Sequence, residues 1–102
     1  MFYKVSNGGT LKATLVNLVN AYNATVPFTA NNGDLICAFT SSTDSRTIGT
    51  CSISGTTSTT LVDNTCVWSR AYVFKVGGSG NLVKYNSMDN GTSGLIVIKI
   101  SK

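Results

Sequence analysis

The chain has 102 residues, of which 42% are apolar and 12% are charged, with a net charge of +4. This length suits one domain with a hydrophobic core, and the apolar content is too high for a disordered chain. The sequence contains no histidine, glutamate or glutamine, and its acidic residues are four aspartates. General acid–base and most metal chemistry rely on histidine and paired carboxylates. The composition therefore argues against an enzyme, and we expect no catalytic residue, metal or cofactor.

The N-terminal residues carry the pattern of one helical face. Its members are Leu11, Leu15, Leu18, Val19 and Tyr22, at positions i, i+4, i+7, i+8 and i+11. This spacing favours a helix over residues 10–22, with a strand as the alternative because alternate positions are also apolar. An apolar stripe of this width has to be covered by its own domain or by a neighbour. We therefore predict that these five residues form an assembly interface, on a segment of residues 1–22 joined to a β-domain of residues 23–102.

The rest of the chain has the pattern of short strands separated by Gly and Asn turns. The expected strands are residues 2–5, 24–29, 35–39, 47–53, 57–62, 66–76, 81–86 and 94–100. Pro27 places its strand at a sheet edge or bulge, and the long run 66–76 suggests a bend near Ser69 and Arg70. Regular strand spacing of this kind is typical of an antiparallel sandwich or barrel. The sequence thus predicts an all-β sandwich of about seven or eight strands with a short N-terminal helix or arm.

The run of residues 66–76 also contains the candidate ligand site. Trp68, Arg70, Tyr72 and Phe74 share one parity, so they form either a platform for a sugar ring or part of the core. We expect Trp68 and Phe74 in the core, because aromatic residues at alternate strand positions are usually buried. Arg70 and Tyr72 remain the candidate ligand-binding residues.

Cysteines, cations and the N-terminus limit the cellular setting. Cys37, Cys51 and Cys66 have no CxxC spacing and lie in apolar runs, which indicates buried free thiols, although one bridge from Cys51 to either neighbour stays open. Lysine and arginine are spread singly along the chain, which argues against nucleic-acid binding. No run approaches the ~18 apolar residues of a membrane span, and the N-terminus lacks the pattern of a signal peptide. We therefore expect synthesis and folding in a reducing cytoplasm.

Three segments together resemble a known group of proteins. They are TANNGDLICAF at residues 29–39, AYVFKV at residues 71–76 and GLIVIKI at residues 94–100. The region from residue 26 to residue 100 resembles small jelly-roll proteins of bacteriophage virions, of the capsid decoration or head and tail fibre type. The resemblance implies a jelly-roll-like sandwich, located in the virion, that binds other capsid or tail proteins without catalysis.

The expected partners follow from this resemblance and from the N-terminal stripe. We expect a homo-oligomer, with a trimer as the favoured state, and no membrane partner. The alternative function is a carbohydrate-binding or receptor-binding module, in which Arg70 and Tyr72 would contact a glycan.

Overall fold

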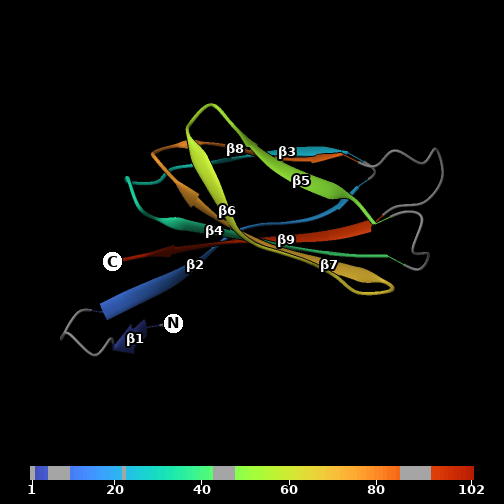
Figure 1. Ribbon diagram of the computed structural model, residues 1–102, viewed down its shortest axis with the longest axis horizontal. Helices are drawn as coiled ribbons and strands as arrows, with labels where there is room; N and C mark the ends of the chain where they lie inside the picture. Colours follow the sequence, from blue (N-terminus) through green and yellow to red (C-terminus); the bar gives the residue numbers. More distant parts are fainter. Residues whose placement is uncertain (1, 5–9, 22, 43–47, 86–92) are drawn as a thin grey trace.

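The computed structural model of the chain is all-β (Figure 1). It describes residues 2–4, 10–21, 23–42, 48–85 and 93–102, and within these ranges lie nine strands and no helix. The strands are β1 (Phe2–Lys4), β2 (Thr10–Ala21), β3 (Ala24–Phe28), β4 (Leu35–Ser41), β5 (Thr50–Ser54), β6 (Ser58–Thr65), β7 (Ser69–Val76), β8 (Gly80–Tyr85) and β9 (Ser93–Ser101). Each hydrogen-bonded pair of neighbouring strands is antiparallel.

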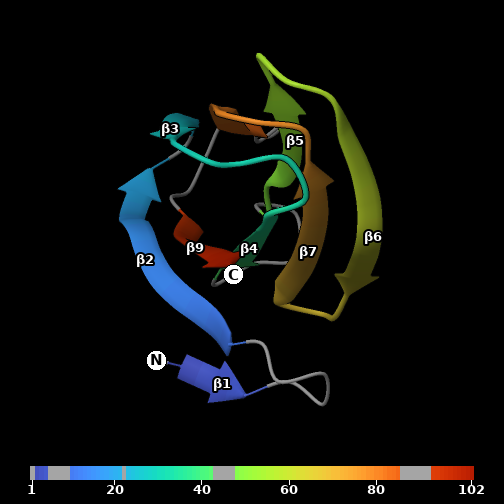
Figure 2. The ribbon, with the colours of Figure 1, turned by 90° about the vertical axis from the view of Figure 1, so that its left-hand side faces the viewer.

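The strands form two sheets that pack on each other as a sandwich. The larger sheet has the order β1-β2-β9-β4-β7-β6, and the smaller sheet has the order β3-β8-β5. Figure 2 shows β2 and β6 at the two sides, with the smaller sheet lying between them above β9, β4 and β7. The predicted all-β class and two-sheet arrangement are confirmed. The described residues hold nine strands where seven or eight were expected, because residues 10–21 form a strand.

The eight strands β2 to β9 pair in a nested order. β2 pairs with β9, β3 with β8 and β4 with β7, so that the first strand meets the last, the second the seventh and the third the sixth. The next nested pair would be β5 with β6. Instead β6 pairs with β7 at the edge of the larger sheet, and β5 is left as an edge of the smaller one.

The helix predicted over residues 10–22 is wrong. Residues 10–21 are strand β2, which pairs with β9 along its length. Two of its side chains, Val16 and Val19, pack against the core between the sheets. Residues 10–21 are therefore part of the sandwich. The boundary predicted between a segment of residues 1–22 and a domain of residues 23–102 falls inside this sandwich.

A β-bulge explains why β2 looks helical in the sequence. The register with β9 shifts between Leu15 and Asn17, which leaves Val16 as the extra residue. Before the bulge, odd-numbered residues such as Leu11 and Leu15 point away from the smaller sheet. After the bulge, Leu18 points to this same side, and it lies opposite Ile96 of β9. The inserted residue thus turns a spacing of two into a spacing of three, and the resulting pattern matches a helical stripe.

The core lies between the two sheets and takes alternate residues from β4, β7 and β9. Its buried members are Val26, Phe28, Ile36, Ala38, Cys51, Tyr72, Phe74, Val76, Leu82, Leu95 and Val97. Tyr72 and Phe74 stack with their ring centroids 5.5 Å apart and their planes at 10°. The expectation that Phe74 is buried is confirmed.

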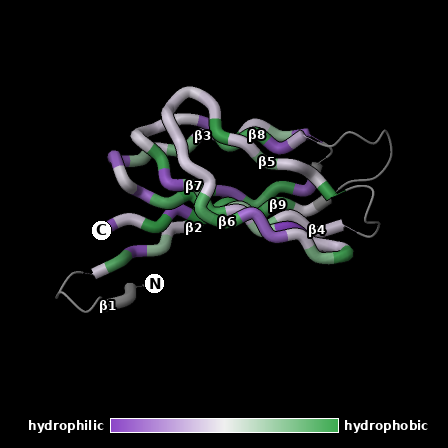
Figure 3. The backbone as a smooth tube through the Cα atoms, in the orientation of Figure 1, coloured by the Kyte–Doolittle hydropathy of each residue, from purple (hydrophilic) through white to green (hydrophobic). Residues whose placement is uncertain are grey.

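Strand β9 has apolar residues at both parities, interrupted by Lys99, and Figure 3 shows part of it in the hydrophobic colour. Leu95 and Val97 face the core and are completely buried. Ile96, Ile98 and Ile100 point to the other side of the larger sheet, where the described residues supply no second layer. A strand that is apolar on both faces but covered on one leaves hydrophobic surface exposed.

Candidate assembly face

The larger sheet presents an apolar surface on the side away from the smaller sheet. Pairing between β2, β9, β4 and β7 aligns three rows of side chains there. The rows are Leu18, Ile96, Phe39 and Ala71; then Leu15, Ile98, Cys37 and Val73; then Ala13, Ile100, Leu35 and Lys75. We call these twelve residues the outer face. Eleven of them are apolar, and Lys75 lies at one corner.

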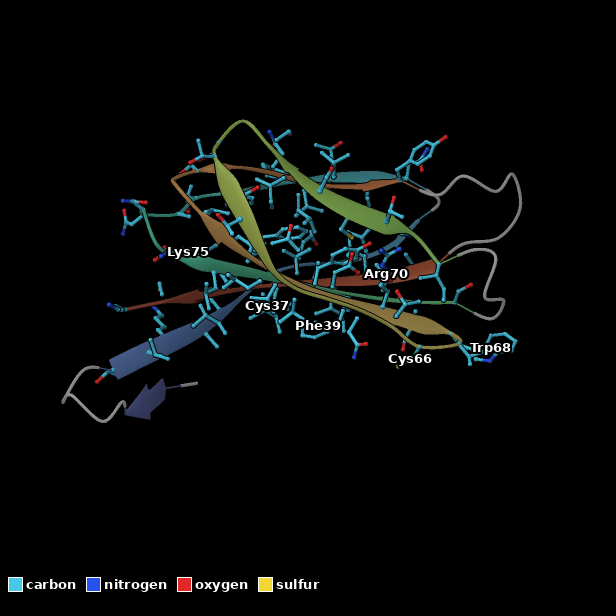
Figure 4. The ribbon with its side chains drawn as sticks, viewed as in Figure 1. Cys37, Phe39, Cys66, Trp68, Arg70 and Lys75 are labelled. Atoms are coloured by element: carbon cyan, nitrogen blue, oxygen red, sulfur yellow. The ribbon has the colours of Figure 1, made fainter. Side chains whose placement is uncertain are left out.

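The outer face is accessible in the single chain. Leu15 is 61% exposed, Leu18 67%, Phe39 42% and Ile96 38%. Cys37 is only 6% exposed, so it forms the floor between taller side chains. Figure 4 shows Phe39 on the side of the larger sheet opposite the smaller one. Scattered exposed apolar residues are common, but a contiguous patch of this kind marks an interaction site.

The structure separates the five residues that the sequence predicted as an assembly interface. Leu11, Leu15 and Leu18 lie on the side of the outer face, whereas Val19 faces the core and is partly buried. Tyr22 lies outside the described residues. The sequence patterns did not predict that β4, β7 and β9 also contribute side chains to the outer face. A signal was present in residues 94–100, which are apolar at both parities. Because one parity is enough to form a core, the other indicated an exposed apolar surface.

Arg70 and Tyr72, the candidate ligand residues, are engaged inside the protein. Tyr72 is 3% exposed, and its ring lies between Phe74 and the Arg70 guanidinium, which is 4.9 Å from the ring centroid. Nε and Nη2 of Arg70 donate to the two carboxylate oxygens of Asp63 at 2.9 and 3.0 Å. These hydrogen bonds hold the pKa of Asp63 below its usual range, whereas burial raises the pKa of Tyr72. The Tyr72 ring therefore offers no free face on which a sugar could stack.

Trp68 differs from the prediction that placed it in the core. The predicted strand of residues 66–76 begins only at Ser69, because residues 66–68 form the turn between β6 and β7. The Cys66 amide donates to the Ser69 carbonyl at 2.8 Å and closes this turn. Trp68 is 51% exposed and Val67 67%. Figure 4 shows Trp68 at the tip of this hairpin.

The three thiols are free and lie in three different environments. Cys37 is buried at the floor of the outer face, Cys51 is buried between the sheets, and Cys66 is exposed, which corrects the prediction for Cys66. Burial raises the pKa of the Cys37 thiol, and it raises that of Cys51 to about 11. Lys84 lies directly opposite Cys51 on β8, is 1% exposed, and has its pKa lowered by burial. A thiol held protonated in this way is a poor nucleophile at neutral pH.

The described residues contain no group of three or more cysteine or aspartate side chains placed to hold a metal ion. In the same part of the chain, no helix has the length and apolar character needed to cross a membrane. The chain matches no protein-family model, no curated protein and no solved structure. Over the residues that the structure describes, the fold and the outer face define a small antiparallel β-domain with an uncovered apolar sheet surface.

Proposed function

We propose that the protein is a non-enzymatic structural component of a virus particle, of the bacteriophage capsid decoration or fibre type. The observation that carries this proposal is the exposed outer face, because a folded domain with a contiguous apolar sheet surface requires a protein neighbour. Capsid or tail proteins and further copies of this chain are the neighbours that a particle supplies. The outer face would contact such a neighbour through apolar side chains, because Lys75 at the corner is the one charged residue among its twelve.

The strand order supports a jelly-roll interpretation of the domain. A jelly roll places eight strands in two sheets through two Greek keys, and this architecture occurs in viral capsid and lectin domains. Here β2-β9-β4-β7 form four neighbours in one sheet and β3-β8-β5 form the other, with the outermost strands of the sequence paired first. β6 departs from a regular jelly roll, in which it would extend the smaller sheet beside β5. We interpret the domain as a jelly roll whose β6 lies in the larger sheet.

The proposal is tested on virus particles grown from the genome that encodes this chain. Particles are purified through a density gradient, and the fractions are analysed by quantitative mass spectrometry. Peptides of this chain should follow the main capsid or tail proteins at a constant ratio across the particle peak. Recovery of the chain only from the soluble fraction would overturn the proposal, provided that capsid peptides sediment normally in the same gradient.

A carbohydrate-binding module is the second candidate, and the exposed ring of Trp68 is the observation that favours it. Exposed tryptophan rings stack on apolar sugar faces, and this ring is accessible at the hairpin tip. A glycan array and fluorescence titration of the full chain test this function, with Trp68→Ala as the variant. Saturable binding that Trp68→Ala removes without lowering the melting temperature would place carbohydrate binding first. The structural proposal predicts no saturable change in emission.

A further inference from the structure

We propose that a second copy of this chain covers the outer face, with the two larger sheets packed face to face about a two-fold axis. This inference rests on the proposed structural function and names the neighbour that the face binds. Three properties of the outer face support a second copy as the binding partner: its charge, its area and the different heights of its side chains.

The uncharged centre of the outer face allows a second copy to bind. Eleven of the twelve side chains are apolar, and the one cation, Lys75, sits at a corner of the outer face. Partners of opposite charge are selected by charged groups, and the centre of this surface has none. The protein carries a net charge of +4, so two copies repel each other elsewhere. The outer face is a surface on which two copies can meet without placing cations opposite each other at the centre.

The area of the outer face approaches that of a specific contact. Four strands spaced about 4.8 Å apart, each contributing about six residues of about 3.3 Å, span roughly 19 by 20 Å. The relief of the side chains adds to this projected area, which brings the buried surface toward the ~800 Å² per partner of a standard interface. Face-to-face sheets stack about 10 Å apart, which leaves room for one layer of side chains from each copy.

The side chains of the outer face differ in height in a way that a two-fold contact can use. Phe39, 42% exposed, projects from β4 two residues away from Cys37, which is 6% exposed and forms the floor. A two-fold interface repeats every contact, so that residue i meets j and j meets i. The Phe39 ring of one copy can thus occupy the space above Cys37 of the other, and the reverse contact follows by symmetry. Both residues lie on β4, which is central in the larger sheet between β9 and β7.

The first test measures mass in solution by sedimentation equilibrium of the full chain. Leu15 on the outer face is 61% exposed, and Tyr85, whose neighbour Lys84 points into the core from β8, is 58% exposed. Leu15→Lys and Tyr85→Lys are therefore matched variants of similar exposure. We expect a dimer for the unaltered chain, about tenfold or more weaker association for Leu15→Lys because a charge would be buried, and little change for Tyr85→Lys. Circular dichroism melting verifies that both variants are folded.

The second test needs no variant. Alkylation of Cys37 and Cys66 is followed by mass spectrometry at protein concentrations below and above the association midpoint. Cys66 is exposed at the hairpin turn and serves as the internal reference. The rate at Cys37 relative to Cys66 should fall as the protein associates, because the second copy covers the floor of the outer face. A ratio independent of concentration in a sample that does associate would refute the contact with Cys37.

The remaining outcomes separate this inference from the proposed function. A chain that is monomeric at all concentrations, but that co-sediments with particles, would overturn the second copy and leave the structural function standing. A trimer, the state expected from the sequence, would overturn the two-fold packing. A dimer that Leu15→Lys does not weaken would show that another surface is used. A dimer of the expected kind that is absent from purified particles would overturn the virion function alone.

Discussion

Replacing Tyr72 with alanine should be among the most destabilising single changes in this protein. The ring is 3% exposed and stacks on Phe74 at a centroid distance of 5.5 Å. Its other side is covered by the Arg70 guanidinium at 4.9 Å, and its phenol oxygen has a hydrogen bond to the backbone of Cys51. Tyr72 thus joins the larger sheet to β5 of the smaller sheet as well as filling the space between them.

The size of the effect follows from these contacts. Truncating a buried aromatic residue to alanine costs about 3–5 kcal/mol in lost burial and cavity formation. Loss of the stacked ring pair contributes about 0.5–1.5 kcal/mol, and a buried amide left without its partner costs about 1–3 kcal/mol. Since these contributions share atoms and do not add, we expect a total of about 4 kcal/mol. Tyr72→Phe removes the hydroxyl alone and should cost about 1–1.5 kcal/mol.

Urea unfolding followed by circular dichroism measures both changes in the free energy of unfolding. Tyr85→Ala is the control, because that side chain is 58% exposed and its loss should lie within about 0.5 kcal/mol. A loss below about 1 kcal/mol for Tyr72→Ala would refute the core assignment, since exposed positions behave in this way. It would also reopen the use of the Tyr72 ring as a ligand platform.

Three further changes test other parts of the structure. Stability should fall as the pH rises from about 9 toward 11, because the folded chain holds the Cys51 proton, with a pKa raised from 9.0 to about 11, after the unfolded chain has lost it. Urea titrations across this pH range should show that the free energy of unfolding falls less in Cys51→Ala than in the unaltered chain, by up to roughly 2–3 kcal/mol. An equal fall in both proteins would contradict the raised pKa of Cys51. Gly33→Ala should cost about 1–2 kcal/mol through its φ of 95°, whereas Gly78→Ala, which meets only ordinary contact at 3.7 Å, should melt near the unaltered chain. Deletion of residues 1–21 removes β2 and uncovers the edge of β9, so the truncated chain should be unfolded by circular dichroism, and a cooperative melt would contradict this.

Local pattern predicted the β-class correctly, and it failed where pairing with a distant strand decided the outcome. Gly and Asn residues predicted turns between the strands, and the turn from Asn31 to Asp34 is one of them: its Gly33 adopts positive φ, and the Asp34 carboxylate accepts a hydrogen bond from the Asn31 amide at 2.9 Å. The bulge at Val16 could not be predicted from the sequence, because a bulge is defined by the register with the partner strand. Trp68 shares parity with Tyr72, but parity does not say where a strand begins.

The outer face shows the same division between sequence and tertiary structure. Alternation and turn residues by themselves predicted short antiparallel strands, and the lack of histidine and glutamate led us to expect no catalysis. Only the tertiary structure decided that Leu18, Ile96 and Phe39 lie side by side, from strands far apart in the sequence. The physical reason is that side-chain parity is local, whereas strand order and register depend on the packing of the whole sheet.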